Sequence, residues 1–236
     1  MQSPSDRRSI VGNADAKADI DQFIAAASKP APAASGRGRL IFALDATMSR
    51  QPTWDLAQAL QARMFETAAA HGGLEVQLVY YRGFRECKAS RFLSGGKDLG
   101  ALMMKISVAA GHTQIARVLR HALDEVQRSP VRALIFIGDA MEEKADDLAD
   151  LAGQAGLLGV KAFVFQEGTD RTVERTFRQI ALLSGGAYAT FDAGAPQRLA
   201  ALLSAVAAYA SGGRPALEAE ARLRGAAADL LLAQMR

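Results

Sequence analysis

The sequence predicts an α/β fold: a doubly wound, mostly parallel sheet with helices on both faces and one short antiparallel edge strand. Two observations support this prediction. Short apolar runs such as residues 40–45 and 131–139 are continuous and end in an acid, as expected of strands buried on both faces of a parallel sheet. Helical patterns of ten or more residues alternate with these runs.

The first buried strand leads into a helix that Pro52 opens and that Gly72 and Gly73 end. We expect its apolar stripe to consist of Leu56, Leu60, Met64 and Phe65. The remaining elements follow the same alternation. Strands are expected at residues 74–83, 131–139, 160–168 and 186–191, the antiparallel edge strand within 86–96, and helices at 99–110, 114–127, 142–158, 172–184 and 196–210.

Composition divides the chain into three parts. Residues 1–38 are rich in Ser, Pro, Ala and Gly and are interpreted as a flexible leader, with one short helix at 14–28. Residues 39–211 form the α/β domain. Residues 212–236 form a helical extension, whose leucines could dock on the domain or on a partner.

Composition also excludes several functional classes. The chain has 236 residues, 50% hydrophobic and 22% charged, which suits a globular domain. Its apolar stretches are too short or too interrupted for a membrane span. A net charge of +3 is too small to indicate nucleic-acid binding. The single cysteine, Cys87, cannot form an internal disulfide, which favours a reducing, cytoplasmic location.

Five oxygen-bearing side chains lie where strands or loops should reach the carboxyl edge of the sheet. Asp45, Thr47 and Ser49 alternate after the first strand, Thr113 precedes a helix, and Asp139 ends a later strand. Ligands of open α/β sheets gather at this edge. Two carboxylates and three hydroxyls are hard ligands that suit Mg²⁺ or Mn²⁺. Because only two of them are charged, the bound ion would remain attractive to an outside carboxylate.

This pattern resembles the metal-ion-dependent adhesion site (MIDAS) of von Willebrand factor type A (VWA) domains, over about residues 39–211. The resemblance implies a Rossmann-like VWA fold in which Ser49 and Thr113 contact the metal directly. Thr47 would take the place of the first serine of the family pattern, and Asp45 and Asp139 would bind directly or through water. The sequence departs from the pattern at Thr47, and at Ala140, where a glycine usually follows the last aspartate.

The resemblance implies a metal-dependent protein-binding module that captures an acidic group of a partner protein and catalyses no reaction. None of the three histidines lies next to a serine or cysteine in a nucleophile motif, which agrees with a non-enzyme.

An alternative is a haloacid-dehalogenase-like phosphotransferase or phosphatase with Asp45 as the nucleophile. Asp45-x-Thr47-x-Ser49 has the spacing of an aspartyl-phosphate motif, and Asp139 with Glu142 resembles the acidic magnesium motif of that family. Against it, residues 114–138 contain no lysine, and Thr47 replaces the second aspartate.

Simpler interpretations of the same residues remain open. Asp45 and Asp139 could cap the helices that follow them, and Thr113 could be the N-cap of the helix at 114–127. Glu142 and Glu143 are expected to be first-turn acids of a helix rather than ligands. A scaffold with an inactive site is the third functional possibility.

Overall fold

Six strands form one sheet, in the order β3-β2-β1-β4-β5-β6. The computed structural model describes residues 36–47, 51–192 and 194–235, all within a unit that spans residues 34–236. The pairs β1–β2, β1–β4, β4–β5 and β5–β6 are parallel, and β3 pairs antiparallel with β2. The predicted fold class, including the antiparallel edge strand, is therefore confirmed. The strands are β1 (Gly38–Asp45), β2 (Leu74–Arg82), β3 (Glu86–Leu93), β4 (Ala133–Gly138), β5 (Lys161–Glu167) and β6 (Ala187–Phe191).

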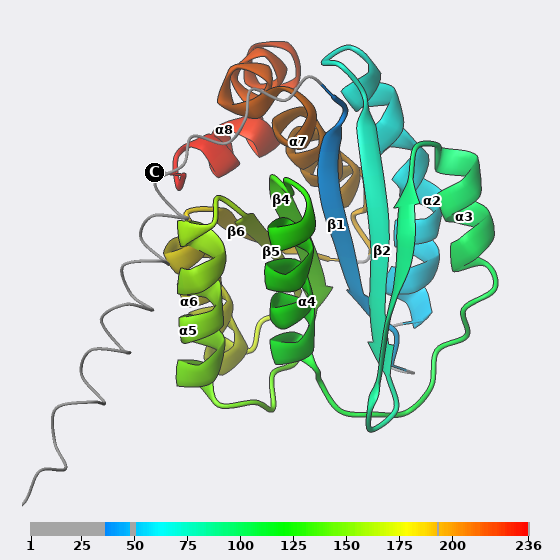
Figure 1. Ribbon diagram of the computed structural model, residues 1–236, viewed down its shortest axis with the longest axis vertical. Helices are drawn as coiled ribbons and strands as arrows, with labels where there is room; N and C mark the ends of the chain where they lie inside the picture. Colours follow the sequence, from blue (N-terminus) through cyan, green and yellow to red (C-terminus); the bar gives the residue numbers. More distant parts are fainter. Residues whose placement is uncertain (1–35, 48–50, 193, 236) are drawn as a thin grey trace, which may run out of the picture. The chain divides into compact units, whose positions relative to one another are not determined.

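Helices cover both faces of this sheet, as Figure 1 shows, with α4 and α5 in front of it and α2 and α7 behind. One apolar layer packs the sheet against α2, α3, α7 and α8, and the other packs it against α4, α5 and α6. The helices are α2 (Gln51–Ala69), α3 (Gly96–Met103), α4 (Ile115–Arg128), α5 (Ala145–Leu157), α6 (Arg171–Ser184), α7 (Pro196–Arg224) and α8 (Ala226–Leu232).

The central strands are buried on both faces, as their continuous apolar sequence predicts. Every residue of β4 is buried, and Leu40 to Leu44 of β1 are at most 1% exposed. Parallel strands require helical crossovers, which cover both sheet faces and leave little room for polar side chains within the strands. Polar groups therefore collect at the strand ends, where the candidate site lies.

The apolar stripe of α2 differs from the prediction. Met64 is fully buried, but Leu56, Leu60 and Phe65 are only half-buried. The largest buried side chain of this helix is Trp54, whose ring meets Tyr80 edge-on with centroids 6.3 Å apart. The buried stripe of α2 instead includes small and polar residues, among them Ala57, Gln61 and Thr67.

The helices α3 and α5 differ from their predicted boundaries. The helix expected at residues 99–110 ends at Met103, and the chain from there to α4 runs as a loop along the sheet edge. The helix expected to begin at Glu142 begins at Ala145. In both places the backbone pairs with distant parts of the chain instead of continuing the helix. Ala109 N–H donates to the Ala46 carbonyl at 3.0 Å, for example.

The helical extension packs on the domain. Helix α7 continues past the predicted end at residue 210, with a kink at Gly213, whose positive φ of 71° suits glycine. Leu217 and Leu231 are fully buried and Met235 is nearly so, whereas Leu223 remains 78% exposed. The strand β1 begins at Gly38, two residues before the predicted strand. The helix predicted at 14–28 lies outside the described residues.

No helix in the described residues combines the length and apolar character needed to cross a membrane.

Candidate functional site

Asp45 and Asp139 lie on neighbouring strands at the same edge of the sheet. Asp45 is the last residue of β1, and Asp139 follows the last residue of β4, its parallel neighbour. Asp45 is 4% exposed. Burial raises the pKa of its carboxyl group, and the negative charge of Asp139 raises it further, while hydrogen bonds from Thr47 lower it. Two carboxylates thus share one poorly solvated place.

Thr47 turns the chain back towards Asp45. Its backbone N–H donates to Asp45 Oδ1 at 2.8 Å, and the residue itself is buried. This bond fixes the Asp45 carboxylate at the end of β1. Ser49, the remaining predicted ligand of this segment, lies outside the described residues.

Thr113 is held by two glutamates from the β4–α5 loop. Its hydroxyl donates to Glu143 Oε2 at 2.6 Å and accepts from the Glu142 backbone N–H at 3.0 Å. Its own N–H donates to Glu142 Oε2 at 3.0 Å, a bond that lowers the pKa of Glu142. The prediction that these glutamates sit in the first turn of a helix is therefore wrong, since they lie before α5 and contact the start of α4.

The capping alternatives are also not realised in α4 and α5. The N-cap of α4 is Gln114, whose side chain makes no capping bond, and Thr113 precedes it. The N-cap of α5 is Lys144 rather than Asp139. Glu143 instead serves α4 from a distant loop, because its Oε1 accepts the Ala116 N–H at 3.1 Å.

Tyr81 has a buried hydroxyl group beside Asp45. It pairs in register with Asp45 on the adjacent parallel strand, so both side chains project from the same face of the sheet. The ring is fully buried and stacks on Phe136. Its hydroxyl lies close enough to Asp45 to lower the pKa of that carboxyl group, but it has hydrogen-bond geometry to no described residue. Burial raises its pKa well above the ordinary value, and the charges of Asp45, Glu143 and Asp139 add to this effect.

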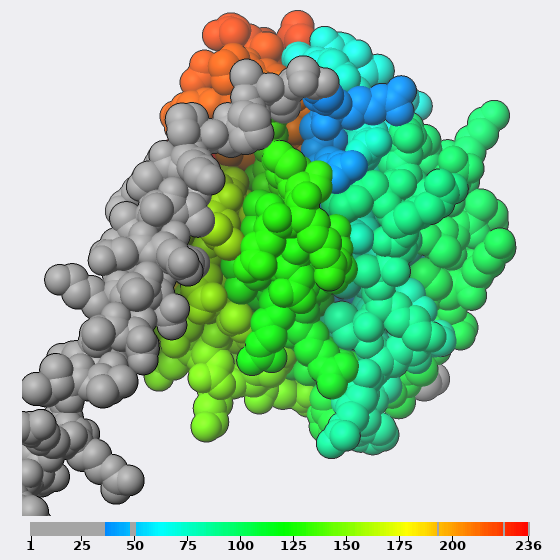
Figure 2. Space-filling model, in the orientation of Figure 1, coloured from blue at the N-terminus to red at the C-terminus, as the bar shows by residue number. Residues whose placement is uncertain are grey.

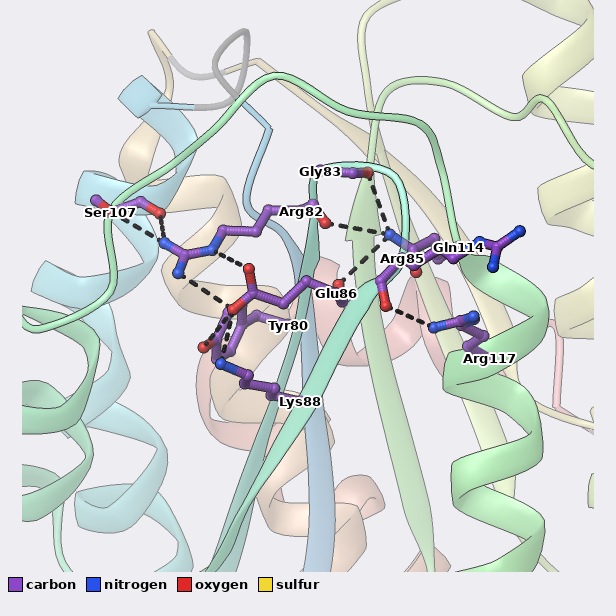
Figure 3. Close-up of polar contacts among 9 residues, drawn as sticks. All are labelled: Tyr80, Arg82, Gly83, Arg85, Glu86, Lys88, Ser107, Gln114 and Arg117. Carbon is purple, nitrogen blue, oxygen red and sulfur yellow. Dashed lines mark hydrogen bonds and ion pairs between the residues drawn. The ribbon is translucent and has the colours of Figure 1, made fainter.

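The loop that carries Thr113 is seated on the turn between β2 and β3. A side chain on Gly111 would collide with the Gly83 backbone at 2.2 Å, so glycine permits this close approach. Gln114 Nε2 lies 3.3–3.4 Å from the carbonyl oxygens of Arg82, Gly83 and Glu86, as Figure 3 shows. These contacts hold the residue next to Thr113 on the β2–β3 turn.

Arginine side chains on both sides of the β2–β3 turn hold it in place. Arg82 pairs with Glu86 at 2.9 Å and also reaches Ser107 of the α3–α4 loop, while Arg117 of α4 donates to the Arg85 carbonyl at 2.7 Å (Figure 3). The pairing with Arg82 lowers the pKa of Glu86 to about 2. The turn protrudes at the lower edge of the face in Figure 2.

An exposed aromatic side chain stands beside the site. Phe84, at the tip of that turn, is 77% exposed, and its ring centroid lies 5.2 Å from that of His112. His112 Nδ1 in turn lies 2.9 Å from Glu142 Oε2.

The donor set fits a small, hard dication. The described residues contain no group of three or more His, Cys, Asp and Glu side chains arranged to hold a metal. A site made of two carboxylates and hydroxyl oxygens is of another kind, and such oxygens are what Mg²⁺ prefers. The unpartnered Tyr81 hydroxyl beside these acids is a buried polar atom whose partner is missing, as expected if a ligand shell completes the site.

Asp45, Thr47, Thr113 and Asp139 are candidate site residues predicted from the sequence, whereas two of their neighbours, Tyr81 and Glu143, are not. Tyr81 lies in a strand buried on both faces, so no polar–apolar alternation marked its hydroxyl. The sequence predicts Glu143 in the first turn of the helix at 142–158 and not in the site. The acidic pair after Asp139 was the only sequence signal for it.

Comparisons with known proteins identify the fold. No family model matches the sequence, and no curated protein matches it. Among solved structures, the VWA domain of SpRpn10 matches with a TM-score of 0.56 and 9% identity over 69% of this chain and 95% of that chain. An aerotolerance-related membrane protein from Bacteroides fragilis matches with a TM-score of 0.51 and 19% identity, over 68% and 95% of the two chains.

Proximal thread matrix protein 1 from the mussel byssus, in a structure with a zinc-occupied MIDAS motif, matches with a TM-score of 0.58 and 15% identity. The match covers 73% of this chain and 46% of that protein, so this chain spans less than half of its length. Together these similarities show that the chain has the VWA fold.

Proposed function

We propose that this chain is a metal-dependent protein-binding module. In the proposal a divalent cation, Mg²⁺ or Mn²⁺, is held by Asp45, Thr47, Ser49, Thr113 and Asp139. When bound, the cation supplies an electrophilic position that attracts an acidic side chain of a partner protein. The protein's own residues hold the cation in place and exclude water from its inner side.

The observation that carries this proposal is the burial of Asp45 beside Asp139 at the carboxyl edge of the sheet. Removing a carboxylate from water is costly unless a positive charge or hydrogen bonds compensate for it. A dication between the two acids would supply that charge. The zinc-occupied MIDAS of the mussel protein, which shares the fold, supports the same interpretation.

The electrostatics of the site argue against the phosphotransferase alternative. Among the described residues, the charged group that acts on the Asp45 carboxyl is Asp139, another acid. A phosphate group brought to Asp45 would need cationic partners to offset its charge. The surroundings of Asp45 instead attract cations, which favours the binding module.

The exposed rim fits a protein partner. Phe84 offers apolar contact area next to the site, and aromatic side chains often anchor protein interfaces. A partner segment with an acidic residue beside an apolar one would match this surface. Cys87 is unpaired, in keeping with the cytoplasmic location that we propose.

Isothermal titration with Mg²⁺ tests the metal site. We expect the wild type to bind one ion and Asp45→Ala to bind none. Asp192→Ala is the matched control, because Asp192 also follows a strand at this edge but is exposed, and within the described residues its side chain accepts only the Gly194 N–H. Equal heats from the wild type and Asp45→Ala would contradict the proposal.

Selection of random displayed peptides on the full chain tests the partner class. With Mg²⁺ present, we expect the peptides that are retained, and then released by EDTA, to be enriched in Asp or Glu. The same enrichment on Asp45→Ala would show that the metal site is not the binding surface.

A further inference from the structure

We propose that Glu143 is a positioning residue of the candidate metal site. By accepting the Thr113 hydroxyl it directs the remaining lone pair of that oxygen to the cation, and it adds a third negative charge, so that the site retains its dication before any partner binds. This inference rests on the proposed function and deepens it.

The hydrogen bonds of the Thr113 hydroxyl define where its free lone pair points. A hydroxyl has one proton to donate and two lone pairs. The proton goes to Glu143 Oε2 at 2.6 Å, and one lone pair accepts the Glu142 N–H at 3.0 Å. Within the described residues one lone pair remains, and a cation can use it without breaking either bond. An acceptor carboxylate on the hydroxyl also makes its oxygen a better metal ligand.

Both oxygens of Glu143 are engaged, which holds the carboxylate in place. Oε2 accepts the Thr113 hydroxyl, and Oε1 accepts the Ala116 N–H at 3.1 Å, at the start of α4. The N-terminus of a helix favours an anion through its free N–H groups and its dipole. Glu143 therefore links the loop that carries Thr113 to the first turn of α4.

The Tyr81 hydroxyl is a second observation, separate from the contacts of Glu143, that supports a bound ligand in this acidic cluster. It is fully buried, it has no hydrogen-bond partner among the described residues, and its charged neighbours are Asp45, Asp139 and Glu143. Buried hydroxyls without partners are rare in proteins, and each calls for an explanation such as an ion or an ordered water. A hydrated dication among the three acids would provide both charge balance and a partner for this hydroxyl.

The third carboxylate changes the expected behaviour of the site. Two carboxylates would neutralise a dication, whereas three leave the cluster with one excess negative charge. Such a site binds its cation more strongly and attracts an outside carboxylate less strongly than the five-ligand set alone. The metal is then a resident component, present in the free protein.

Glu142 is a natural control for this proposal. It carries the same charge one residue away, but its side chain contacts Thr113 only at the backbone N–H and is 50% exposed. Its backbone N–H, which donates to the Thr113 hydroxyl, is kept in a Glu142→Gln variant. A general loss of negative charge near the site would affect both variants. Positioning of the hydroxyl would affect only Glu143.

The test is a titration of the full-length, partner-free chain with Mn²⁺, in which the electron paramagnetic resonance signal reports the free ion. We expect Glu143→Gln to weaken Mn²⁺ binding by roughly 10- to 100-fold, the usual effect of losing an outer-shell partner. Glu142→Gln should stay close to the wild-type affinity.

Thermal melting without metal checks that each variant is folded. If Glu143→Gln is not, Glu143→Asp, which keeps the charge but shortens the reach, is measured in its place and should also bind more weakly.

Two outcomes would overturn the inference while leaving the proposed function intact. In the first, Glu143→Gln binds Mn²⁺ like the wild type. In the second, Glu142→Gln loses as much affinity as Glu143→Gln. Failure of the proposed function is distinguishable from both, because then the wild type binds no Mn²⁺ or binds it no better than Asp45→Ala.

Discussion

Two polar regions of this fold contrast in how completely their hydrogen bonds are satisfied. At the edge strand β6, the Gln234 side chain pairs with the backbone of Tyr188, donating to its carbonyl at 2.9 Å and accepting from its N–H at 3.0 Å. The Tyr188 hydroxyl donates to buried Gln166 at 2.6 Å. This region is complete by itself, and Gln234 covers a strand edge that could otherwise pair with another chain.

The carboxyl ends of β1, β2 and β4 are organised in the opposite way. Asp45 is buried beside another acid, and the Tyr81 hydroxyl has no partner among the described residues. The difference between the two regions shows which one serves stability. The β6 edge has its polar groups paired within the folded chain, whereas on the proposed function the candidate metal site would be completed by a bound cation.

The largest expected effect is stabilisation by metal. At a free Mg²⁺ concentration of 100 times its dissociation constant, the free energy of unfolding should rise by about 2.7 kcal/mol. The reason is that the folded site binds the ion and the unfolded chain does not. Urea unfolding with Mg²⁺ and with EDTA measures the difference. Asp45→Ala should unfold identically in both, and Mg²⁺-dependent stabilisation of that variant would remove the contrast between the regions.

Gln234→Ala should destabilise the chain by about 1–2 kcal/mol, because it leaves two buried backbone groups of Tyr188 unpaired. The effect should be the same with and without Mg²⁺, since β6 lies away from the candidate site. Urea unfolding measures it, and Gln154→Ala, on the exposed face of α5, is the surface control. A loss that depends on metal would mean that the two regions are coupled.

Two tyrosine-to-phenylalanine changes should have opposite signs. Tyr81→Phe removes an unpartnered hydroxyl and should stabilise the metal-free protein by up to about 1 kcal/mol. Tyr188→Phe removes a hydroxyl that is bonded to Gln166 and should destabilise it by a similar amount. Thermal or urea unfolding in EDTA compares them. Destabilisation by both would show that Tyr81 has a partner in the metal-free fold.

The smallest expected effect is a dependence of stability on pH that comes from His121. This side chain is paired within the fold, like the polar groups at the β6 edge, because its Nε2 lies 2.8 Å from Gln77 Oε1. Burial lowers its pKa, although the charges of Glu125 and Asp124 act in the opposite direction and Arg128 acts with burial. The unfolded chain then binds more protons just below pH 6.5, so stability should fall as the pH decreases through 6.5. His121→Gln should flatten the unfolding free energy in that range, and an unchanged slope would contradict this assignment.

The sequence was sufficient to predict the strands and the acids that end them. Continuous apolar runs identify β1 and β4 as central strands, and parallel pairing then brings Asp45 and Asp139 to one edge. These features depend on local pattern and on the general rules of sheet topology.

The contact between Thr113 and Glu143 could not be predicted in this way. It joins residues 30 positions apart, and it exists because α5 begins three residues later than its acidic sequence suggests. Tertiary pairing overrode a local helix signal there. The same is true of the loop after Met103, whose helical pattern gives way to contacts with the turn between β2 and β3.

The most direct test of the metal site is a crystal grown with Mn²⁺ and measured at the manganese absorption edge. The account predicts one anomalous peak between Asp45 and Asp139, within about 2.2 Å of the Thr113 hydroxyl oxygen. Manganese found only elsewhere on the molecule, with Asp45 and Asp139 still facing each other without it, would contradict the account.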